Sequence, residues 1–454
     1  MAQTIAALST APGGAIGIVR ISGDQAEAYL HALFTPAGGR GMQPRVLTYG
    51  TLTVDGRVID RPMAVYFPAP ATYTGEPMAE IHCHGSSAIL EATLAALFAL
   101  GARQAGPGEF TRRAFLNGKM DLFAAEAVGD LVCARSAEAA SLAVNQLGGH
   151  LSADFADMRQ QLVAICAQFL AVIDYPDEEI EDLPVQEIAR TLDEMQVRLA
   201  GLRDSYARGR ALREGLPCAI IGRPNAGKST LLNALLGYDR AIVTEIAGTT
   251  RDTVEETLHL GALVLRLQDT AGLRETDDPV EKIGVTRARE AVRLAGESGV
   301  VLAVFDGSRP VTGEDRMVMR AVQGAKCAVA VLNKADLPRA DGWEALHGTF
   351  AQVVPLSAKK REGLGALTDT LTALTGVRDL PADGGLITNL RQAETLSRTA
   401  RHLDEAAARL REGYPPDAVV YDIEGAIESL GEITGQSVQA DIVDHIFANF
   451  CVGK

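Results

Sequence analysis

The spacing of hydrophobic positions changes in character along the first half of the chain. Up to about residue 116, apolar runs of strand length, such as AIGIVRIS (15–22) and MAEIHCH (78–84), alternate with stretches of helical periodicity. From 117 to 213 the periodicity is helical, and the acidic segment DYPDEEIEDLP (174–184) interrupts it. These patterns predict an N-terminal α+β domain at 1–116 followed by helices.

A third pattern occupies residues 214–379, where apolar strands alternate with helices. Such alternation predicts an α/β domain with a largely parallel sheet. After the loop LPADGG (380–385), helical periodicity returns and continues to the end of the chain. A domain whose termini lie close together can be inserted into a loop of another. We therefore expect a discontinuous helical domain, formed by 117–213 and 380–454, that is interrupted by the α/β domain.

Composition and charge exclude several classes of protein. A chain of 454 residues is too long for a single core. The formal charge of −15 and the pI near 5.1 argue against a general nucleic-acid binder, so any RNA contact is expected to be local or shared with a partner. The longest apolar stretch (88–101) is short and contains Glu91, and the N-terminus lacks a secretory pattern. Six cysteines without paired spacing indicate reduced thiols, and together these features predict a cytoplasmic protein without a membrane segment.

The segment GRPNAGKS (222–229) matches the phosphate-binding pattern G-x-x-x-x-G-K-[ST] between an apolar strand and a helix. Backbone N–H groups of such a loop surround the phosphates, Lys228 reaches the β and γ oxygens, and the Ser229 hydroxyl binds Mg²⁺. The residues expected to contact the nucleotide here are Asn225, Ala226, Gly227, Lys228, Ser229 and Thr230.

Three further motifs follow in the order of a GTPase, each after a predicted strand. They are Asp269-Thr270-Ala271-Gly272, Asn333-Lys334-Ala335-Asp336 and Ser357-Ala358-Lys359. The Asp269 carboxylate can hold the Mg²⁺ shell, and the Gly272 N–H can reach the γ-phosphate. The Asp336 carboxylate can accept both N1–H and N2–H₂ of guanine, and adenine lacks that pair of donors. The motifs therefore predict GTP, rather than ATP, as the substrate.

The Gly- and Thr-rich loop AIVTEIAGTTRD (241–252) lies where a GTPase has its first switch. The residues expected at the nucleotide are Thr244, Glu245, Ile246, Ala247, Gly248, Thr249 and Thr250. Thr250 is the expected second hydroxyl ligand of Mg²⁺. An ordinary turn threonine is the alternative interpretation of Thr249. In signalling GTPases a Gln follows the glycine of the Asp-x-x-Gly turn and orients the attacking water, but here that position is Leu273. Either GTP is not hydrolysed, or the catalytic groups come from elsewhere.

Three segments are more specific than the GTPase motifs: GTTRD (248–252), GEFTRRAFLNGKMDLFAAEA (108–127) and the terminal FCVGK. With them the chain resembles, over essentially its whole length, the MnmE (TrmE) family of tRNA-modification GTPases. The resemblance implies an N-terminal tetrahydrofolate-binding and dimerisation domain, a split helical domain and an inserted Ras-like P-loop GTPase domain. It also implies a homodimer that works with the flavoprotein MnmG, which supplies FAD. Together they would use 5-formyl- or methylene-tetrahydrofolate to install an aminomethyl-type group at C5 of the tRNA wobble uridine.

The same resemblance supplies the catalytic groups that Leu273 does not. It implies a potassium ion that offsets charge on the β–γ oxygen, bound by Asn225 and by oxygens of Thr244, Ile246 and Thr249. It assigns the orientation of the attacking water to Glu281, in the segment DDPVEKIG. Without the resemblance, a solvated acid at the start of a helix is the simpler interpretation of Glu281.

A second cluster of chemistry lies near the N-terminus. Glu80, His82 and His84 alternate, so they share one face of a strand, but no partner cluster at ligand spacing supports a metal site. The resemblance instead assigns tetrahydrofolate to Glu80, Arg20, Lys119 and Lys454. Surface cations are the alternative interpretation of Arg20 and Lys119.

The end of the chain carries the last candidate residue. Ile442, Ile446, Phe447 and Phe450 predict a docked helix that carries the terminal Cys-x-Gly-Lys to a fixed place. The resemblance implies that this place is the folate pocket and that Cys451 takes part in tRNA modification. An inert thiol is the alternative for Cys451.

Three other functions remain open from the sequence. A ribosome-assembly GTPase would share the nucleotide motifs, although no KH-like GXXG segment with basic flanks is present. A regulatory switch with slow hydrolysis is compatible with Leu273. A folate-dependent transferase could retain a GTPase domain as a structural part alone.

Overall fold

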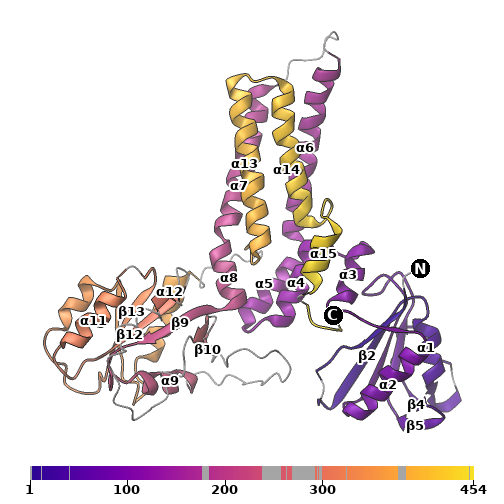
Figure 1. Cartoon of the computed structure of the whole chain (residues 1–454), viewed down its shortest axis with the longest axis horizontal. Helices are drawn as coiled ribbons and strands as arrows, with labels where there is room; N and C mark the ends of the chain where they lie inside the picture. The colour runs from indigo at the N-terminus through magenta and orange to yellow at the C-terminus, as the bar shows by residue number, and fades with distance from the viewer. Residues whose placement is uncertain are drawn as a thin grey trace. The chain divides into compact units, whose positions relative to one another are not determined.

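The fold consists of two units, and each draws on separate parts of the chain (Figure 1). The first unit comprises Met1–Val132, Gln146–Asp193 and Arg401–Lys454, and the second comprises Cys133–Asn145 and Glu194–Ala400. The computed structural model describes residues 3–11, 13–39, 41–175, 184–237, 257–261, 263–267, 292–293, 295, 299–323, 325–376, 385–448 and 450–453.

The first unit begins with an eight-stranded sheet in the order β3-β4-β6-β7-β2-β1-β8, with β5 paired to β4. Its strands are β1 (Ile5–Leu8), β2 (Ile16–Ser22), β3 (Phe34–Pro36), β4 (Thr48–Val54), β5 (Arg57–Asp60), β6 (Met63–Phe67), β7 (Met78–His84) and β8 (Arg103–Gln104). The pairs are antiparallel except for β1 with β8.

Two helices, α1 (Ala26–Leu33) and α2 (Ser87–Ala99), cover one face of this sheet. Alternate strand residues such as Val19, Ile21 and Ile81 pack against them in one buried cluster. Because strand side chains alternate between faces, Arg20, Glu80 and His82 lie on the opposite face. The alternation of β2 and β7 thus separates a core face from a polar face.

Besides α1 and α2, the first unit contains α3 (Glu109–Leu116), α4 (Leu122–Cys133), α6 (His150–Asp174), α14 (Pro416–Thr434) and α15 (Ala440–Ala448). In α6, buried residues recur every three or four positions and form one apolar stripe against α14, as expected for an amphipathic helix. The stripe consists of Leu151, Phe155, Met158, Leu162, Ile165 and Phe169. Helices α7 (Val185–Asp204) and α13 (Leu390–Glu412) contribute residues to both units.

The second unit contains a six-stranded sheet in the order β10-β11-β9-β12-β13-β14. Its strands are β9 (Leu216–Ile221), β10 (Thr257–Leu260), β11 (Leu263–Leu267), β12 (Val300–Asp306), β13 (Ala328–Asn333) and β14 (Gln352–Pro355). All pairs are parallel except β10 with β11, which confirms the predicted α/β domain with a largely parallel sheet.

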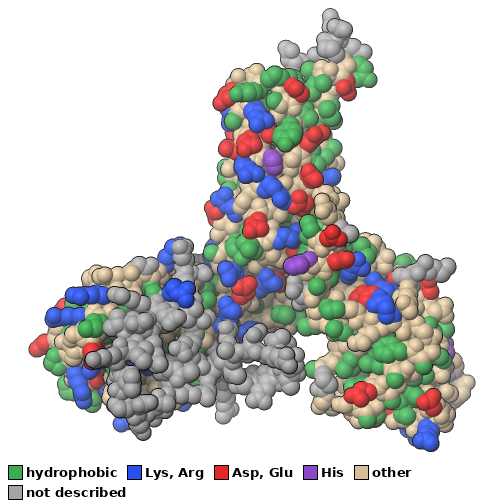
Figure 2. All heavy atoms as spheres, viewed as in Figure 1, with side chains coloured by type: hydrophobic (Ala, Val, Ile, Leu, Met, Phe, Trp, Pro, Cys, Tyr) green, Lys and Arg blue, Asp and Glu red, His purple; other side chains and the backbone are tan. Residues whose placement is uncertain are grey.

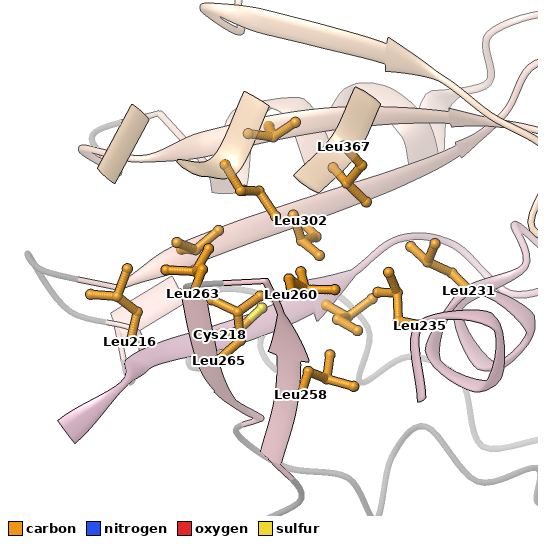
Figure 3. Packing of buried hydrophobic residues seen from close by; sticks show 14 of the residues in the cluster. Leu216, Cys218, Leu231, Leu235, Leu258, Leu260, Leu263, Leu265, Leu302 and Leu367 are labelled. Carbon is orange, nitrogen blue, oxygen red and sulfur yellow. The ribbon is translucent and has the colours of Figure 1, made fainter. Parts of the chain in front are cut away.

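Helices pack on both faces of this second sheet. Figure 3 shows one face, where strand leucines such as Leu302 and Leu265 belong to the same buried cluster as Leu231 and Leu367 from the helices. On the other face Trp343 and Phe305 are buried together. The helices of this unit are α5 (Ala137–Leu147), α8 (Tyr206–Glu214), α9 (Lys228–Leu236), α11 (Gly313–Ala321) and α12 (Leu364–Thr375), with a 3-10 turn at Trp343–Gly348. A sheet buried on both faces explains why its strands read as continuous apolar runs.

The distribution of charged side chains on the surface is consistent with the expectation, drawn from the net charge, that the chain is not a general nucleic-acid binder. On the visible face, described Lys and Arg side chains are interspersed with Asp and Glu (Figure 2). Among the described residues, no helix combines the length and apolarity needed to cross a bilayer.

Candidate functional site

Three loops at the carboxyl ends of β9, β13 and β14 meet around one side chain, that of Asn333. Its Nδ2 donates to Ala226 O at 3.0 Å, and its Oδ1 accepts from Lys334 N at 2.8 Å and Ala358 N at 3.0 Å. Asn333 is 3% exposed, so these bonds lie in a dry environment. One amide therefore joins the phosphate loop to the two loops that are expected to hold the base.

The phosphate loop requires glycine at this junction. Gly227 has φ +97°, and a Cβ placed on it would lie 2.2 Å from Asn333 Nδ2. The next residue, Lys228, begins α9, so the free N–H groups and the positive end of the helix dipole face the loop. Lys228 Nζ donates to Gly222 O at 2.8 Å and Arg223 O at 3.0 Å. The loop geometry thus surrounds the position where phosphates are expected.

Asp336 is held in its charged form. The Ser357 hydroxyl donates to Asp336 Oδ1 at 2.8 Å. This bond, assisted by the nearby Lys360 and Lys359, lowers the pKa of Asp336 below its ordinary value. An ionised carboxylate is the acceptor that the two guanine donors need.

Sequence reasoning missed an aspartate beneath these loops, Asp306 at the end of β12. Its side chain is 2% exposed, and its Oδ2 lies 2.6 Å from Lys334 Nζ and 3.8 Å from Arg223 Nη2. Burial alone would raise the pKa of Asp306, but hydrogen bonds from Lys334 and Ser308 outweigh it and lower that pKa. The available signal was an acidic residue that ends a strand of seven buried residues, VVLAVFD.

Arg223 extends the same network to a helix. Its Nε lies 3.2 Å from Oδ1 of Asp315, which is fully buried. Asp315 also forms a capping box with Thr312 at the start of α11. The second residue of the phosphate loop is therefore tied to two buried carboxylates.

The remaining predicted nucleotide residues lie outside the described part of the chain. They are Thr244, Glu245, Ile246, Ala247, Gly248, Thr249, Thr250, Asp269, Thr270, Ala271, Gly272 and Glu281. The second magnesium ligand, the other potassium ligands and the water-orienting group therefore stay predictions. Asn225, Ala335 and Lys359 are described and belong to the loops just discussed, and Ser229 and Thr230 lie in the first turn of α9.

On the polar face of the N-terminal sheet, Arg20 and Glu80 are register partners on β2 and β7. Arg20 Nε donates to Glu80 Oε1 at 2.9 Å, and His82 Nε2 lies 3.2 Å from Glu80 Oε2. The bond to His82 is the largest influence on Glu80, and with Arg20 it outweighs burial and lowers the pKa of that carboxyl. Glu80 is thus ionised and still 16% exposed.

Aromatic rings flank this pair. The Arg20 guanidinium carbon lies 5.7 Å from the ring centre of Phe110 and 5.9 Å from that of Tyr73. His84, although on the same strand face, pairs with Asp60 at 2.7 Å between Nδ1 and Oδ1. Among the described residues, His84 therefore does not join Glu80 and His82 in a metal-binding group.

The chain end reaches the Arg20–Glu80 pair. Helix α15 buries Phe447, with Ile446 and Phe450 partly buried against the same cluster. The expectation for Ile442 was wrong, because it is 41% exposed and does not belong to that cluster. Beyond the helix, Gly108 N donates to Cys451 O at 3.2 Å.

The last described residue, Gly453, completes the contact. Its carbonyl accepts from Arg20 Nη1 at 3.3 Å and from Ser9 Oγ at 3.1 Å. The Cys451 thiol is exposed, and Lys454 lies outside the described residues. Lys119 Nζ donates to Pro70 O at 3.2 Å and, within the described contacts, forms no bond with Arg20 or Glu80.

Comparisons with known proteins agree with this architecture. A family model described as the N-terminus of the GTP-binding protein TrmE matches residues 4–119, and one described as the MnmE helical domain matches 122–451. The tRNA modification GTPase MnmE of Heliobacterium modesticaldum is 42% identical, over 100% of this chain and 99% of that protein. The protein of the same name from Roseiflexus sp. is 43% identical with the same coverage.

A solved structure, the G domain of the T. maritima FeoB iron transporter, is 22% identical. The match covers 35% of this chain and 98% of that one, with a TM-score of 0.26.

Proposed function

Since the chain belongs to the MnmE (TrmE) family of tRNA modification GTPases, we propose that its GTP hydrolysis depends on potassium and drives a folate-dependent tRNA modification. In this proposal the flavoprotein MnmG is the partner and brings FAD. A tetrahydrofolate one-carbon unit is converted to an aminomethyl or carboxymethylaminomethyl group at C5 of the wobble uridine. The ribosome-assembly alternative has no support among these full-length relatives.

The observation that carries the proposal is the convergence of the chain end on the Arg20–Glu80 pair. An ionised carboxylate flanked by Phe110 and Tyr73 suits a pterin ring, which offers an N3–H and an amino group to an acceptor. Within the described part of the chain each Glu80 oxygen has one partner, and a carboxylate oxygen can accept a second hydrogen bond. The residues therefore fit the group. Arg20, Glu80, Lys119 and Lys454 are the proposed folate ligands.

At the nucleotide site the chain's own residues bind and orient GTP. Asp336 accepts from the guanine, Lys228 exchanges its carbonyl partners for phosphate oxygens, and the N–H groups at the start of α9 surround the phosphates. Mg²⁺, held by Ser229 and Thr250, would neutralise charge on the β and γ oxygens. Glu281 is the proposed group that holds the attacking water.

Potassium would act at the same phosphates. Asn225, whose φ of +59° turns the loop at this point, is the described member of the proposed ligand set. Thr244, Ile246 and Thr249 are the others. A cation there would stabilise charge that develops in the transition state. Glu281, and not the potassium ion, would take the water-orienting role that Leu273 cannot fill.

The proposed assembly is a homodimer with MnmG and tRNA, in the cytoplasm. We further propose the domain order 1–116, 117–213, 214–379 and 380–454, with the GTPase domain inserted into the helical domain.

The first test is GTP turnover in potassium against sodium at matched ionic strength. We expect the rate to fall steeply in sodium. Asn225→Ala should lose this preference yet still bind GTP, because Lys228 and Mg²⁺ remain. Equal rates for the natural chain in both salts would remove potassium from the proposal.

A further inference from the structure

Helices α13 and α14 hold a cluster of polar residues that neither the GTP site nor the folate site uses. His402 and Glu405 lie on α13, and Asp422 lies on α14. Each offers one metal-ligating atom, and these atoms all lie within 4.8 Å of one another. Among the described residues this is the single group of histidine, cysteine and acidic side chains with that property.

The spacing in the sequence suits metal binding between helices. Residues three apart on a helix lie on the same face, one turn from each other, so His402 and Glu405 point toward the same neighbour. Helical proteins build metal sites from a histidine and a glutamate at this spacing on one helix together with a carboxylate from a facing helix. Asp422 supplies that carboxylate here.

The cluster contains buried polar atoms without hydrogen bonds. Asp422 has a side chain that is 1% exposed, and within the described part of the chain neither of its oxygens has a hydrogen-bond partner. His402 Nδ1 is also buried and unpaired among these residues. Burial of polar atoms such as Asp422 Oδ1 and His402 Nδ1 without a hydrogen bond or an ion-pair partner is costly and uncommon, so a ligand for them is to be expected.

Two arginines compensate part of the charge. Arg409 Nη1 lies 2.9 Å from Asp422 Oδ2, and it also donates to Ala418 O at 3.1 Å. Arg401 Nε lies 4.0 Å from Glu405 Oε1, which is a loose contact. Among the described atoms, neither arginine forms a hydrogen bond with Asp422 Oδ1 or His402 Nδ1.

The imidazole ring is fixed against the opposite helix by a glycine. Gly425 follows Asp422 by three residues, on the same face of α14. A Cβ on Gly425 would lie 2.8 to 3.1 Å from three ring atoms of His402, so the ring packs directly on the helix backbone. Such packing positions a ligand before any metal arrives.

We propose that His402, Glu405 and Asp422 bind one divalent transition-metal ion, with Zn²⁺ as the reference case, and that this ion links α13 to α14. One imidazole and two carboxylates suit Zn²⁺ and its neighbours, whereas Mg²⁺ and Ca²⁺ prefer oxygen ligands alone. Ligand atoms around such an ion lie roughly 3 to 3.5 Å apart, which small side-chain rotations from the present positions supply. In the metal-free chain Arg409 is the counter-ion of Asp422.

The test uses the full-length chain, freed of metal with a chelator and titrated with Co²⁺ and Zn²⁺. We expect one high-affinity ion per chain, a raised melting temperature with Zn²⁺, and a Co²⁺ spectrum of nitrogen and oxygen ligands without a thiolate charge-transfer band. Mg²⁺ at millimolar concentration should not compete. His402→Gln should weaken Zn²⁺ binding by roughly 10²-fold, the scale for loss of one ligand or its support. His347→Gln, at an exposed histidine elsewhere, is the matched control.

A second variant keeps the test informative if His402→Gln fails to fold. Arg409→Gln keeps all three ligands but removes the metal-free counter-ion. It should melt at a lower temperature in chelator and recover with Zn²⁺ to a greater degree than the natural chain. Zn²⁺ binding by His402→Gln that equals that of the natural chain would overturn the proposal. A thiolate charge-transfer band with Co²⁺ would overturn it as well. So would an unchanged melting temperature of Arg409→Gln on addition of Zn²⁺.

Discussion

The GTP site and the Arg20–Glu80 site select their ligands with the same kind of group but position it differently. Asp336 stands on a loop at the carboxyl edge of a parallel sheet, and Ser357 from another loop holds it. Glu80 stands on a strand of an antiparallel sheet, and its partners Arg20 and His82 lie on the same sheet face. At the GTP site, which we call the loop site, the backbone conformation of several loops positions the side chains. At the Arg20–Glu80 site, which we call the strand site, the register of β2 with β7 positions them.

This difference predicts how each site responds to change. In the loop site, the Asn333 side chain forms hydrogen bonds to three segments, so a substitution that displaces one segment should displace the other two as well. In the strand site, a register pair is fixed by the ladder itself, so single side chains can be exchanged without moving the backbone.

The largest expected effect comes from Asp336→Asn. An amide cannot accept both guanine donors, so the ratio of kcat/KM for GTP to that for xanthosine triphosphate should fall on the order of 10³-fold. Ser357→Ala leaves the carboxylate in place, and its effect on this ratio should be much smaller. If Asp336→Asn leaves the ratio unchanged, the loop site does not select the base through this carboxylate.

A smaller effect is expected from Glu80→Gln. Loss of a charged hydrogen-bond acceptor costs about 1.5–3 kcal/mol, which corresponds to roughly 10- to 150-fold weaker tetrahydrofolate binding measured by calorimetry. GTP turnover should stay within about twofold, because the strand site and the loop site belong to different sheets. Parallel loss of GTP turnover would contradict the separation of the two sites.

Deletion of Cys451–Lys454 tests the same site from the chain end. The carbonyl of Gly453 accepts from Arg20 and Ser9, so its removal should weaken folate binding and abolish modification in an assay with MnmG and tRNA. Cys451→Ser keeps those contacts, so it separates a role of the thiol from a role of the backbone. Full modification by the shortened chain would show that the tail is dispensable.

Beneath the loop site, Asp306→Asn should weaken GTP affinity by roughly 10-fold. The change leaves Lys334 and Arg223 with a neutral partner inside the sheet edge, so both loops lose their anchor. Asp341→Asn, at an exposed aspartate in the same unit, is the control for a change of charge alone. Equal GTP affinities for the two variants would leave Asp306 without a positioning role.

At the start of α3, in the same unit as the strand site, Glu109→Gln gives the smallest effect, on stability. Burial would raise the pKa of Glu109, but bonds from Arg103, Gly106 and Arg113 outweigh it and lower the pKa to about 2. Because the folded pKa is depressed, this stabilisation is present above the ordinary value of 4.5 and is lost as the pH falls toward 2. The variant should therefore melt a few degrees lower at pH 6, roughly the effect of 1–2 kcal/mol, and the difference should shrink toward pH 3.5. A pH-independent difference would point to packing.

The sequence by itself determined the features that rest on contiguous residues. The phosphate loop lies between β9 and α9 as its pattern predicts, because the glycine positions and the helix start are local requirements. The strands 216–221 and 328–333 were recognisable as apolar runs, since a sheet covered on both faces buries nearly all of their side chains. The assignment of Glu80, Arg20 and Lys454 to tetrahydrofolate came from the family resemblance alone and not from the spacing of residues.

Tertiary structure decided which distant residues meet. Arg20 and Glu80 are 60 positions apart, and the register of β2 with β7 makes them neighbours. Asp306 serves Lys334 and Arg223 because parallel strands bring their carboxyl ends to one edge. Ile442 fits the helical pattern and is nevertheless exposed. Periodicity indicates which face of a helix is apolar, but it does not say how much of that face the rest of the protein covers. His402 and Asp422 lie on different helices and come together only because α13 and α14 pack against each other. The spacing of residues along one helix does not determine which residue of another helix it will face.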